Sequence, residues 1–510
     1  MRKELAALTK ETFIYGTSTV LSRFLNFLLV PFYVNVLATT AEYGIASSLY
    51  AWMAFLNVIY PLGLEGAFFR YASRGEQEDI DPINNRKNFS TPFNVVAIFS
   101  LLLSTVIFIT AAHLAPPLFR NPKTDIEPML LELTRIIQYS SIILFFDGLS
   151  LLPFAHLRLE HRAKLFASIK LTNVVITLIL NFYLILGLHL GVEGIFIANM
   201  IASIMTFLFL LPSFLKQWWA KIDRAVLAKM LPFGLTNVPA NLGAMMVQVI
   251  DRPIVQFYLG LGAVGVYQAN YRMGFIMMVF VSLFEYAWRP FFMRQHKTDD
   301  VHARLIFSRV FTYFMVLALI LFLGLSFFLP YILSTPVFGR RLLRADYLVG
   351  MSIIPVVLFA YIFQGMYTNF IAGIYIKERN KVLPYITGLG AAVNVGVNIL
   401  LIPRIGIMGG AIATLAAYMV MALVIYIESQ KVYRVNYEWV RIGKVFLMVA
   451  AAFGLERILF LENWVTSLYG VFFLRCGLSV AVILGLFPAG FFSEREIHFL
   501  KSFIPRRSLM

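Results

Sequence analysis

The chain has 510 residues, of which 60% are hydrophobic and only 14% are charged, and its formal net charge is +16. Ordinary soluble domains carry about 25% charged residues, so this composition excludes a water-soluble globular protein. The basic excess would indicate nucleic-acid binding in a soluble protein, but here the positions of Lys and Arg indicate membrane topology instead. A single cysteine, Cys476, excludes an intramolecular disulfide bond.

Apolar stretches of roughly 20 residues or more recur along the chain, and each can cross the hydrocarbon core of a bilayer as a helix. We therefore expect an all-α, polytopic membrane protein with about fourteen transmembrane helices. The first stretch is too long for a signal-peptide core, so we expect it to stay as the first span. In chain order, the expected spans are 12–37, 45–69, 92–118, 131–157, 165–188, 192–215, 230–258, 262–290, 304–328, 347–373, 382–403, 407–428, 441–460 and 468–492.

The distribution of positive charge predicts the orientation of the chain. Roughly three quarters of the 43 Lys and Arg residues lie in the two tails or in the connections after even-numbered spans. Because Lys and Arg are retained on the cytoplasmic side, both termini are predicted to be cytoplasmic.

The two halves of the chain resemble each other. The segments "GVEGIFIANMIA" (191–202) and "GIMGGAIATLAA" (406–417) share the pattern G-x-x-G-x-x-I-A-x-x-x-A, and Gly44 and Tyr50 match Gly265 and Tyr271 at one common offset. An even number of spans per copy makes both copies enter from the same side, which predicts a parallel repeat about an axis along the membrane normal. We expect two pseudo-symmetric six-helix lobes at 1–217 and 218–430, and two additional helices with a cytoplasmic tail at 431–510.

Motifs of soluble enzymes are absent from the sequence. There is no G-x-x-x-x-G-K-[ST] or H-E-x-x-H pattern, and the seven His residues lack metal-ligand spacing. A D-x-D pattern at Asp79 and Asp81 is found in metal-dependent glycosyltransferases, but here it lies in a short connection with no nucleotide-sugar domain. We expect a solvated loop there, no metal site, no cofactor and no enzymatic activity.

Ionisable side chains within the spans are the main candidates for function. Each costs roughly 2.5 to 3.5 kcal/mol at membrane depth, so it faces protein or water. In the first and seventh spans such residues share a helical face with other polar side chains. The candidate substrate-binding residues are Arg23, Asn26, Asn241, Asp251, Arg252, Tyr267, Tyr271 and Arg272.

Other interpretations stay open for several of these residues. Asp251 beside Arg252 is equally compatible with a fixed ion pair, and Tyr267 and Tyr271 are compatible with packing. Asp147, near the centre of the fourth span, is the candidate ion-coupling residue. Arg475, near the outer end of the last span, is expected to extend its guanidinium to the interface.

The second and eighth spans end on similar charged pairs. Glu65 and Arg70 end the second span, and Glu285 and Arg289 end the eighth, both on the predicted cytoplasmic side. Pairs across the two lobes, Glu65 with Arg289 and Glu285 with Arg70, would close an inner gate. The alternative is that the four side chains reach the interface independently.

Three segments carry a resemblance to a known family. The segments "EYGIASSLY", "DRPIVQFYLGLGAVGVYQANYRM" and "RIGIMGGAIATLAAY" resemble the polysaccharide transporter family, the Wzx-type lipid-linked oligosaccharide flippases. That family belongs to the superfamily that also contains lipid II flippases and multidrug and toxin extruders. In addition, "SR" at Ser22 and Arg23 resembles the first-helix arginine of lipid II flippases, which lies in their central cavity.

The resemblance implies that a polyprenyl-pyrophosphate-linked oligosaccharide is flipped from the cytoplasmic to the outer leaflet by alternating access. The product would serve the biosynthesis of cell-surface polysaccharide such as the O-antigen of lipopolysaccharide. The resemblance also implies a monomer in the bacterial cytoplasmic membrane, with membrane lipids around it and glycan-assembly enzymes as candidate partners.

Two alternatives are carried forward. A multidrug extruder of the same fold would favour an acidic cavity, whereas the deep charges here are mainly basic. A membrane glycosyltransferase or polymerase would need a catalytic carboxylate motif in an outward-facing loop, which the sequence lacks. Coupling to a monovalent cation or to the membrane potential is left open.

Overall fold

The computed structural model describes residues 16, 20–22, 24–72, 82–120, 126–295, 300–337, 340–461 and 468–491. Within these residues the protein is helical except for a short antiparallel hairpin, β1 (Pro336–Val337) and β2 (Arg340–Arg341). The expected all-α class is confirmed. A helix over residues 24–36 precedes α2.

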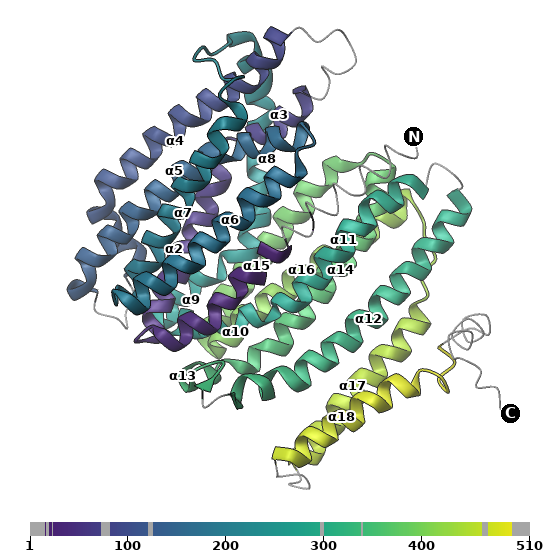
Figure 1. Cartoon of the computed structure of the whole chain (residues 1–510). Helices are drawn as coiled ribbons and strands as arrows, with labels where there is room; N and C mark the ends of the chain where they lie inside the picture. Colours follow the sequence, from purple (N-terminus) through teal and green to yellow (C-terminus); the bar gives the residue numbers. More distant parts are fainter. Residues whose placement is uncertain are drawn as a thin grey trace, which may run out of the picture. The chain divides into compact units, whose positions relative to one another are not determined.

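The helices follow one another with short connections (Figure 1). Their bounds are α2 (Thr40–Ile59), α3 (Leu64–Ala72), α4 (Pro82–Phe119), α5 (Leu130–Leu159), α6 (Ala163–Asn181), α7 (Gly191–Phe214), α8 (Arg224–Val249), α9 (Asp251–Leu259), α10 (Leu261–Tyr271), α11 (Phe275–Gln295), α12 (Asp300–Ser334), α13 (Ala345–Leu348), α14 (Ile354–Ile376), α15 (Leu383–Ile405), α16 (Ile407–Val432), α17 (Trp439–Leu461) and α18 (Leu468–Gly485). Short 3-10 turns adjoin some of them, at η2 (Glu127–Met129), η4 (Arg272–Gly274), η5 (Met351–Ile353) and η6 (Asn380–Val382), and a π-helix, η3 (Phe182–Gly187), continues α6.

Ten helices of the described residues are long and apolar enough to cross a membrane. They coincide with ten of the expected spans, so the protein is a multi-pass membrane protein. The expected spans at 12–37, 230–258, 441–460 and 468–492 are not among the ten. The number fourteen and the cytoplasmic placement of both termini therefore stay predictions.

The described residues form two compact units. The first unit comprises the described parts of Met1–Phe275, Leu342–Val357 and Lys381–Met421. The second unit comprises those of Ile276–Arg341, Leu358–Asn380 and Ala422–Met510. These units group residues by contact and do not test a sequence repeat, so the domain boundaries at 217 and 430 stay predictions.

Aromatic packing joins α4, α5, α6 and α7 of the first unit, which Figure 1 shows as a group of long helices. Phe93 lies 5.0 Å from Phe214 between ring centres, and Phe154 lies 5.1 Å from Phe166. Because lipid is as apolar as these side chains, tight packing rather than exclusion from water holds such helices together.

Two glycines allow α2 and α10 to cross at backbone contact. A Cβ atom on Gly44 would lie 1.9 Å from the carbonyl oxygen of Leu261, and one on Gly265 would lie 2.0 Å from that of Thr40. No larger residue fits either position without separating the helices. The two contacts are reciprocal: Thr40 and Gly44 precede Leu261 and Gly265 by the same offset.

The connection between α7 and α8 is attached to the first half of α4. The indole nitrogen of Trp218 donates to Asn94 Oδ1 at 2.8 Å, and Lys87 Nζ lies 3.3 Å from Asp223 Oδ2. Asp223 also caps α8 by accepting hydrogen bonds from the backbone amides of Ala225 and Val226. The predicted boundary between the repeats is therefore an ordered segment.

An ion pair joins α17 and α18 to α12 in the second unit. Arg475 Nη2 lies 2.8 Å from Glu456 Oε1, and its Nη1 donates to the carbonyl oxygen of Phe327 at 2.8 Å. The guanidinium of Arg475 is therefore paired with an acidic residue of the adjacent helix, and its extension to the membrane interface stays a prediction.

Candidate functional site

The backbone break between α8 and α9 creates a buried charged site. Pro232 and Pro239 lie within this segment, and α8 continues through both. The break falls at Ile250 instead. Pro253 has no backbone N–H to donate to the carbonyl of Val249, and the amide of Arg252 donates to Asp251 Oδ1 at 3.0 Å rather than to Gln248. The carbonyl groups of Gln248 and Val249 therefore lose their usual helical partners.

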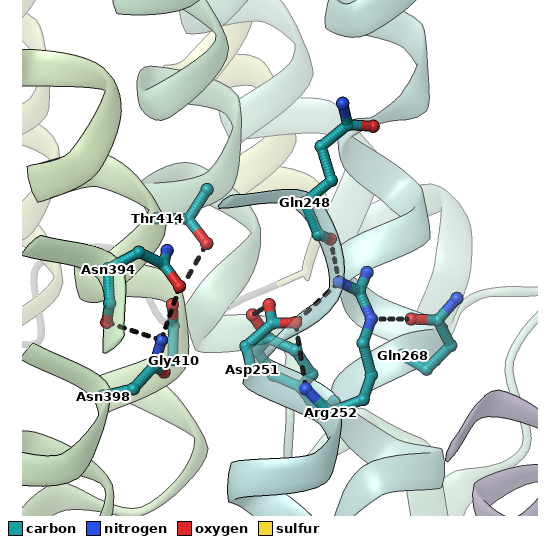
Figure 2. Close-up of polar contacts among 9 residues, drawn as sticks. Gln248, Asp251, Arg252, Gln268, Asn394, Asn398, Gly410 and Thr414 are labelled. Atoms are coloured by element: carbon teal, nitrogen blue, oxygen red, sulfur yellow. Dashed lines mark hydrogen bonds and ion pairs between the residues drawn. The ribbon is translucent and has the colours of Figure 1, made fainter. Parts of the chain in front are cut away.

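Asp251 and Arg252 lie at this break and supply hydrogen bonds to the groups around it (Figure 2). The Arg252 guanidinium donates to Asp251 Oδ1 at 2.6 Å, to the freed carbonyl of Gln248, and to Gln268 Oε1 at 2.9 Å. The hydroxyl of Tyr267 donates to Asp251 Oδ2. Asp251 is 1% exposed and Arg252 is 6% exposed, so the pair is removed from solvent.

The tyrosines of α10 complete the enclosure. The guanidinium carbon of Arg252 lies 4.5 Å from the ring centre of Tyr271, which is itself buried. Both carboxylate oxygens of Asp251 have donors, and the guanidinium carbon of Arg252 also lies 5.9 Å from the ring centre of Tyr267. The geometry therefore favours the fixed ion pair over an open ligand site. A substrate role for Asp251, Arg252, Tyr267 and Tyr271 stays a prediction.

Side-chain amides from α15 lie beside this pair (Figure 2). Asn398 Nδ2 donates to the carbonyl and to the side-chain oxygen of Asn394, at 2.8 and 2.9 Å. Both residues are fully buried, and Asn398 Oδ1 has no partner in the described part of the chain. Arg252 already neutralises the carboxylate of Asp251 beside them.

Three of the predicted substrate-binding residues are exposed. These are Asn26, Asn241 and Arg272, all in the first unit. Phe27 stacks on Phe275 with ring centres 5.0 Å apart, which places the helix over residues 24–36 beside Arg272. Arg23 lies outside the described residues.

Asp147 is exposed as well, although it lies well inside the span Glu127–Leu159. The hydroxyl of Ser203 on α7 donates to Asp147 Oδ1 at 2.7 Å. Asp147 also interacts electrostatically with Lys170 on α6 and with Tyr50 on α2. Its ion-coupling role stays a prediction.

Lys170 is a site residue that sequence reasoning missed. In the structure it is an exposed residue of α6 within the span Ala163–Gly187. A polar face shared with Asn173, Thr177 and Asn181 was the available signal.

The predicted gate residues have partners within their own units. Glu65 forms an ion pair with Arg158 of α5, and Arg70 lies over the ring of Phe233 at 4.4 Å. In the second unit, Glu285 and Arg289 pair along α11 at 2.5 Å. The gate across the two lobes stays a prediction.

The chain is similar to a known protein family and to known membrane proteins. The family model described as polysaccharide biosynthesis protein matches residues 36–292. An uncharacterized membrane protein of Methanocaldococcus jannaschii is 21% identical, over 96% of this chain and 97% of its own length.

Two solved structures show the same fold. The lipid II flippase MurJ, in an inward closed conformation, matches with a TM-score of 0.70 at 15% identity, over 92% of this chain and 97% of its own. A multidrug resistance MATE family transporter of the MOP superfamily, in an inward-facing conformation, matches with a TM-score of 0.58 at 14% identity, over 80% and 94% of the two chains.

Proposed function

We propose that this chain, which belongs to the polysaccharide biosynthesis protein family, carries a lipid-linked oligosaccharide across a membrane. It is a multi-pass membrane protein whose fold is that of MOP-superfamily flippases and transporters. This fold supports a transporter rather than an enzyme. The substrate and the direction of transport are our proposal.

The observation that supports this substrate is the exposure of Arg272. This arginine lies within the span Leu261–Met293, and its side chain is nevertheless exposed. A guanidinium at that depth faces water or protein, because facing hydrocarbon is costly. Arginine offers paired donors to phosphate oxygens, so a pyrophosphate head group suits it.

In this proposal the head group enters from the cytoplasmic leaflet, and the lipid tail stays in the bilayer while the protein alternates between two states. An anion that moves outward gains about 2.3 kcal/mol per charge for each 100 mV of inside-negative potential. The potential can therefore drive transport without a nucleotide site, unless inward-moving cations reverse the sign. The product would feed surface polysaccharide assembly in a bacterial cytoplasmic membrane, with glycan-assembly enzymes as partners of a monomer.

Extrusion of cationic compounds is the second candidate. The exposed carboxylate of Asp147 favours it, because a cationic compound needs an anionic partner inside the membrane. The exposed Arg272 and Lys170 weigh against it, since both would repel such a substrate.

The deciding experiment uses the purified full-length protein in vesicles. We expect it to flip a fluorescent polyprenyl-diphosphate oligosaccharide and to leave a cationic dye untransported. Arg272→Ala should lower flipping roughly 10-fold or more, as expected for loss of a charged hydrogen bond. Arg224→Ala, at the exposed first residue of α8, is the matched control and should transport normally.

Arg23 gives a second test from the resemblance. Arg23→Ala should abolish flipping while folded protein is still recovered from the membrane, and Arg23→Lys should restore it only in part. Dye efflux without flipping would instead identify an extruder.

A further inference from the structure

A group of four charges lies on α3, α5 and α6 of the first unit, apart from the buried pair at Asp251. Glu65 is paired with Arg158, and Lys170 interacts electrostatically with Glu65, Arg158 and Asp147. Two positive and two negative side chains therefore share one region and balance in charge. None of them is completely buried.

Lys170 and Asp147 lie at membrane depth. Lys170 is the eighth residue of α6, so it lies about 10 Å along the helix from its start at Ala163. Asp147 lies about 18 Å along α5 from the end of that helix at Leu159. Both side chains are exposed, and charges at such depth must face water or protein.

Lys170 and Asp147 do not satisfy each other by direct contact. Within the described residues Lys170 and Asp147 interact electrostatically, but they form no direct ion pair. The ammonium group of Lys170 instead lies 4.4 Å from the ring centre of Phe154. Asp147 accepts one hydrogen bond, from Ser203. Exposed donors of Lys170 and acceptor positions of Asp147 are thus available to a ligand.

We propose that Lys170 and Asp147 bind the junction between phosphate and sugar in the transported head group, an inference that rests on the proposed function. Lys170 donates to the phosphate oxygens, for which an ammonium group is a suitable partner. Asp147 accepts hydrogen bonds from sugar hydroxyls, held in orientation by Ser203. The polar contact of Asn199 with Tyr50, at 2.7 Å and one turn along α7 from Ser203, extends the hydrogen-bonding surface for the sugar.

The ligand class follows from the charge balance. A ligand with phosphate alone would be attracted by Lys170 and repelled by Asp147, and a neutral sugar would lose the contact with Lys170. A phosphate-linked sugar uses both. The site therefore distinguishes a sugar phosphate from inorganic pyrophosphate, which a purely basic site would not.

Binding to the detergent-solubilised full-length protein tests this inference, with glucose 1-phosphate, inorganic pyrophosphate and glucose as probes. Lys170→Met should weaken binding of both phosphate-containing probes roughly 10- to 100-fold, the range for one charge-assisted hydrogen bond. Asp147→Asn should weaken glucose 1-phosphate but not pyrophosphate. Lys164→Met, six residues earlier in α6 and exposed, is the control and should bind like wild type.

Thermal unfolding of each variant separates a lost contact from a lost fold, and Lys170→Arg should retain part of the phosphate affinity. Equal effects of Lys170→Met and Lys164→Met, or absence of probe binding by the wild-type protein, would overturn the inference. If Lys170→Met flips the lipid-linked oligosaccharide as well as the wild-type protein does, the site is refuted and the proposed function stands. If the probes bind in a Lys170-dependent manner but the wild-type protein flips no lipid-linked oligosaccharide, the binding site stands and the proposed function is refuted.

Discussion

The buried pair Asp251 and Arg252 and the exposed pair Asp147 and Lys170 both place a carboxylate and a cation at membrane depth, but the protein satisfies only the first pair by direct contacts. Arg252 contacts Asp251 at 2.6 Å, and both carboxylate oxygens of Asp251 have donors. Asp147 and Lys170 are exposed and make no direct ion pair in the described residues. The comparison teaches that charge at membrane depth does not by itself indicate a ligand site. What distinguishes the two is whether the protein already satisfies the charges.

The largest effect on stability is expected at the buried pair Asp251 and Arg252. Arg252→Met leaves Asp251 buried without its cation, which should lower the free energy of unfolding by about 3 to 5 kcal/mol. The double variant Asp251→Asn/Arg252→Met removes both charges and should be markedly more stable than Arg252→Met. Thermal unfolding in detergent measures both. If Arg252→Met is as stable as wild type, the buried pair does not hold the break together.

At the exposed pair Asp147 and Lys170, substitution should affect flipping rather than stability. Lys170→Met should change the free energy of unfolding by less than about 1 kcal/mol, as for other exposed charges, while flipping in vesicles falls. Stability and flipping are measured on the same preparation. A loss of stability comparable to that of Arg252→Met would show that Lys170 is structural and would erase the contrast.

Intermediate behaviour is expected for Glu65 and Arg158, whose side chains are 32% and 38% exposed. A double-mutant cycle with Glu65→Gln and Arg158→Gln should give a coupling free energy of about 0.5 to 1 kcal/mol in stability. The i,i+4 pair Glu285 and Arg289 is the control and should give about 0.2 to 0.5 kcal/mol.

The same method tests the predicted gate across the lobes. Glu65→Arg should impair flipping, and adding Arg289→Glu should restore much of it. If the double variant shows only the sum of the two defects, these residues are not coupled.

The smallest effect concerns Asp223, which lies outside the membrane spans. Hydrogen bonds from the amide of Val226 and from Lys87 hold the pKa of this carboxyl below its usual value. A lowered folded-state pKa stabilises the protein above the unfolded-state pKa, and this contribution is lost as pH falls. Below about pH 4, wild type should therefore lose stability more steeply than Asp223→Asn. Parallel pH profiles of the two would contradict the cap.

The sequence was sufficient for the features that depend on hydrophobicity alone. The all-α class and the span at 192–215, found as Gly191–Phe214, follow from the length of apolar runs. The position of the helix break did not follow, because two prolines within α8 are tolerated and only Pro253 ends it. Such tolerance depends on which neighbouring groups replace the lost hydrogen bond.

Partners of charged residues were the least predictable part of the site. Glu65 pairs with Arg158 and Arg475 with Glu456, and in each case the two residues lie on different helices. Helical periodicity shows which residues share a face but not which face meets which neighbour. Lys170 was recognisable in principle, since periodicity within one helix places it on a polar face.

The crossing of α2 and α10 has a consequence for the origin of the molecule. Thr40 and Gly44 face Leu261 and Gly265, and each segment presents to the other the same surface that it receives. Such reciprocity is the property of an isologous interface between two identical subunits. The contact is what a symmetric dimer of a half-length ancestor would leave after its gene was duplicated and the copies joined.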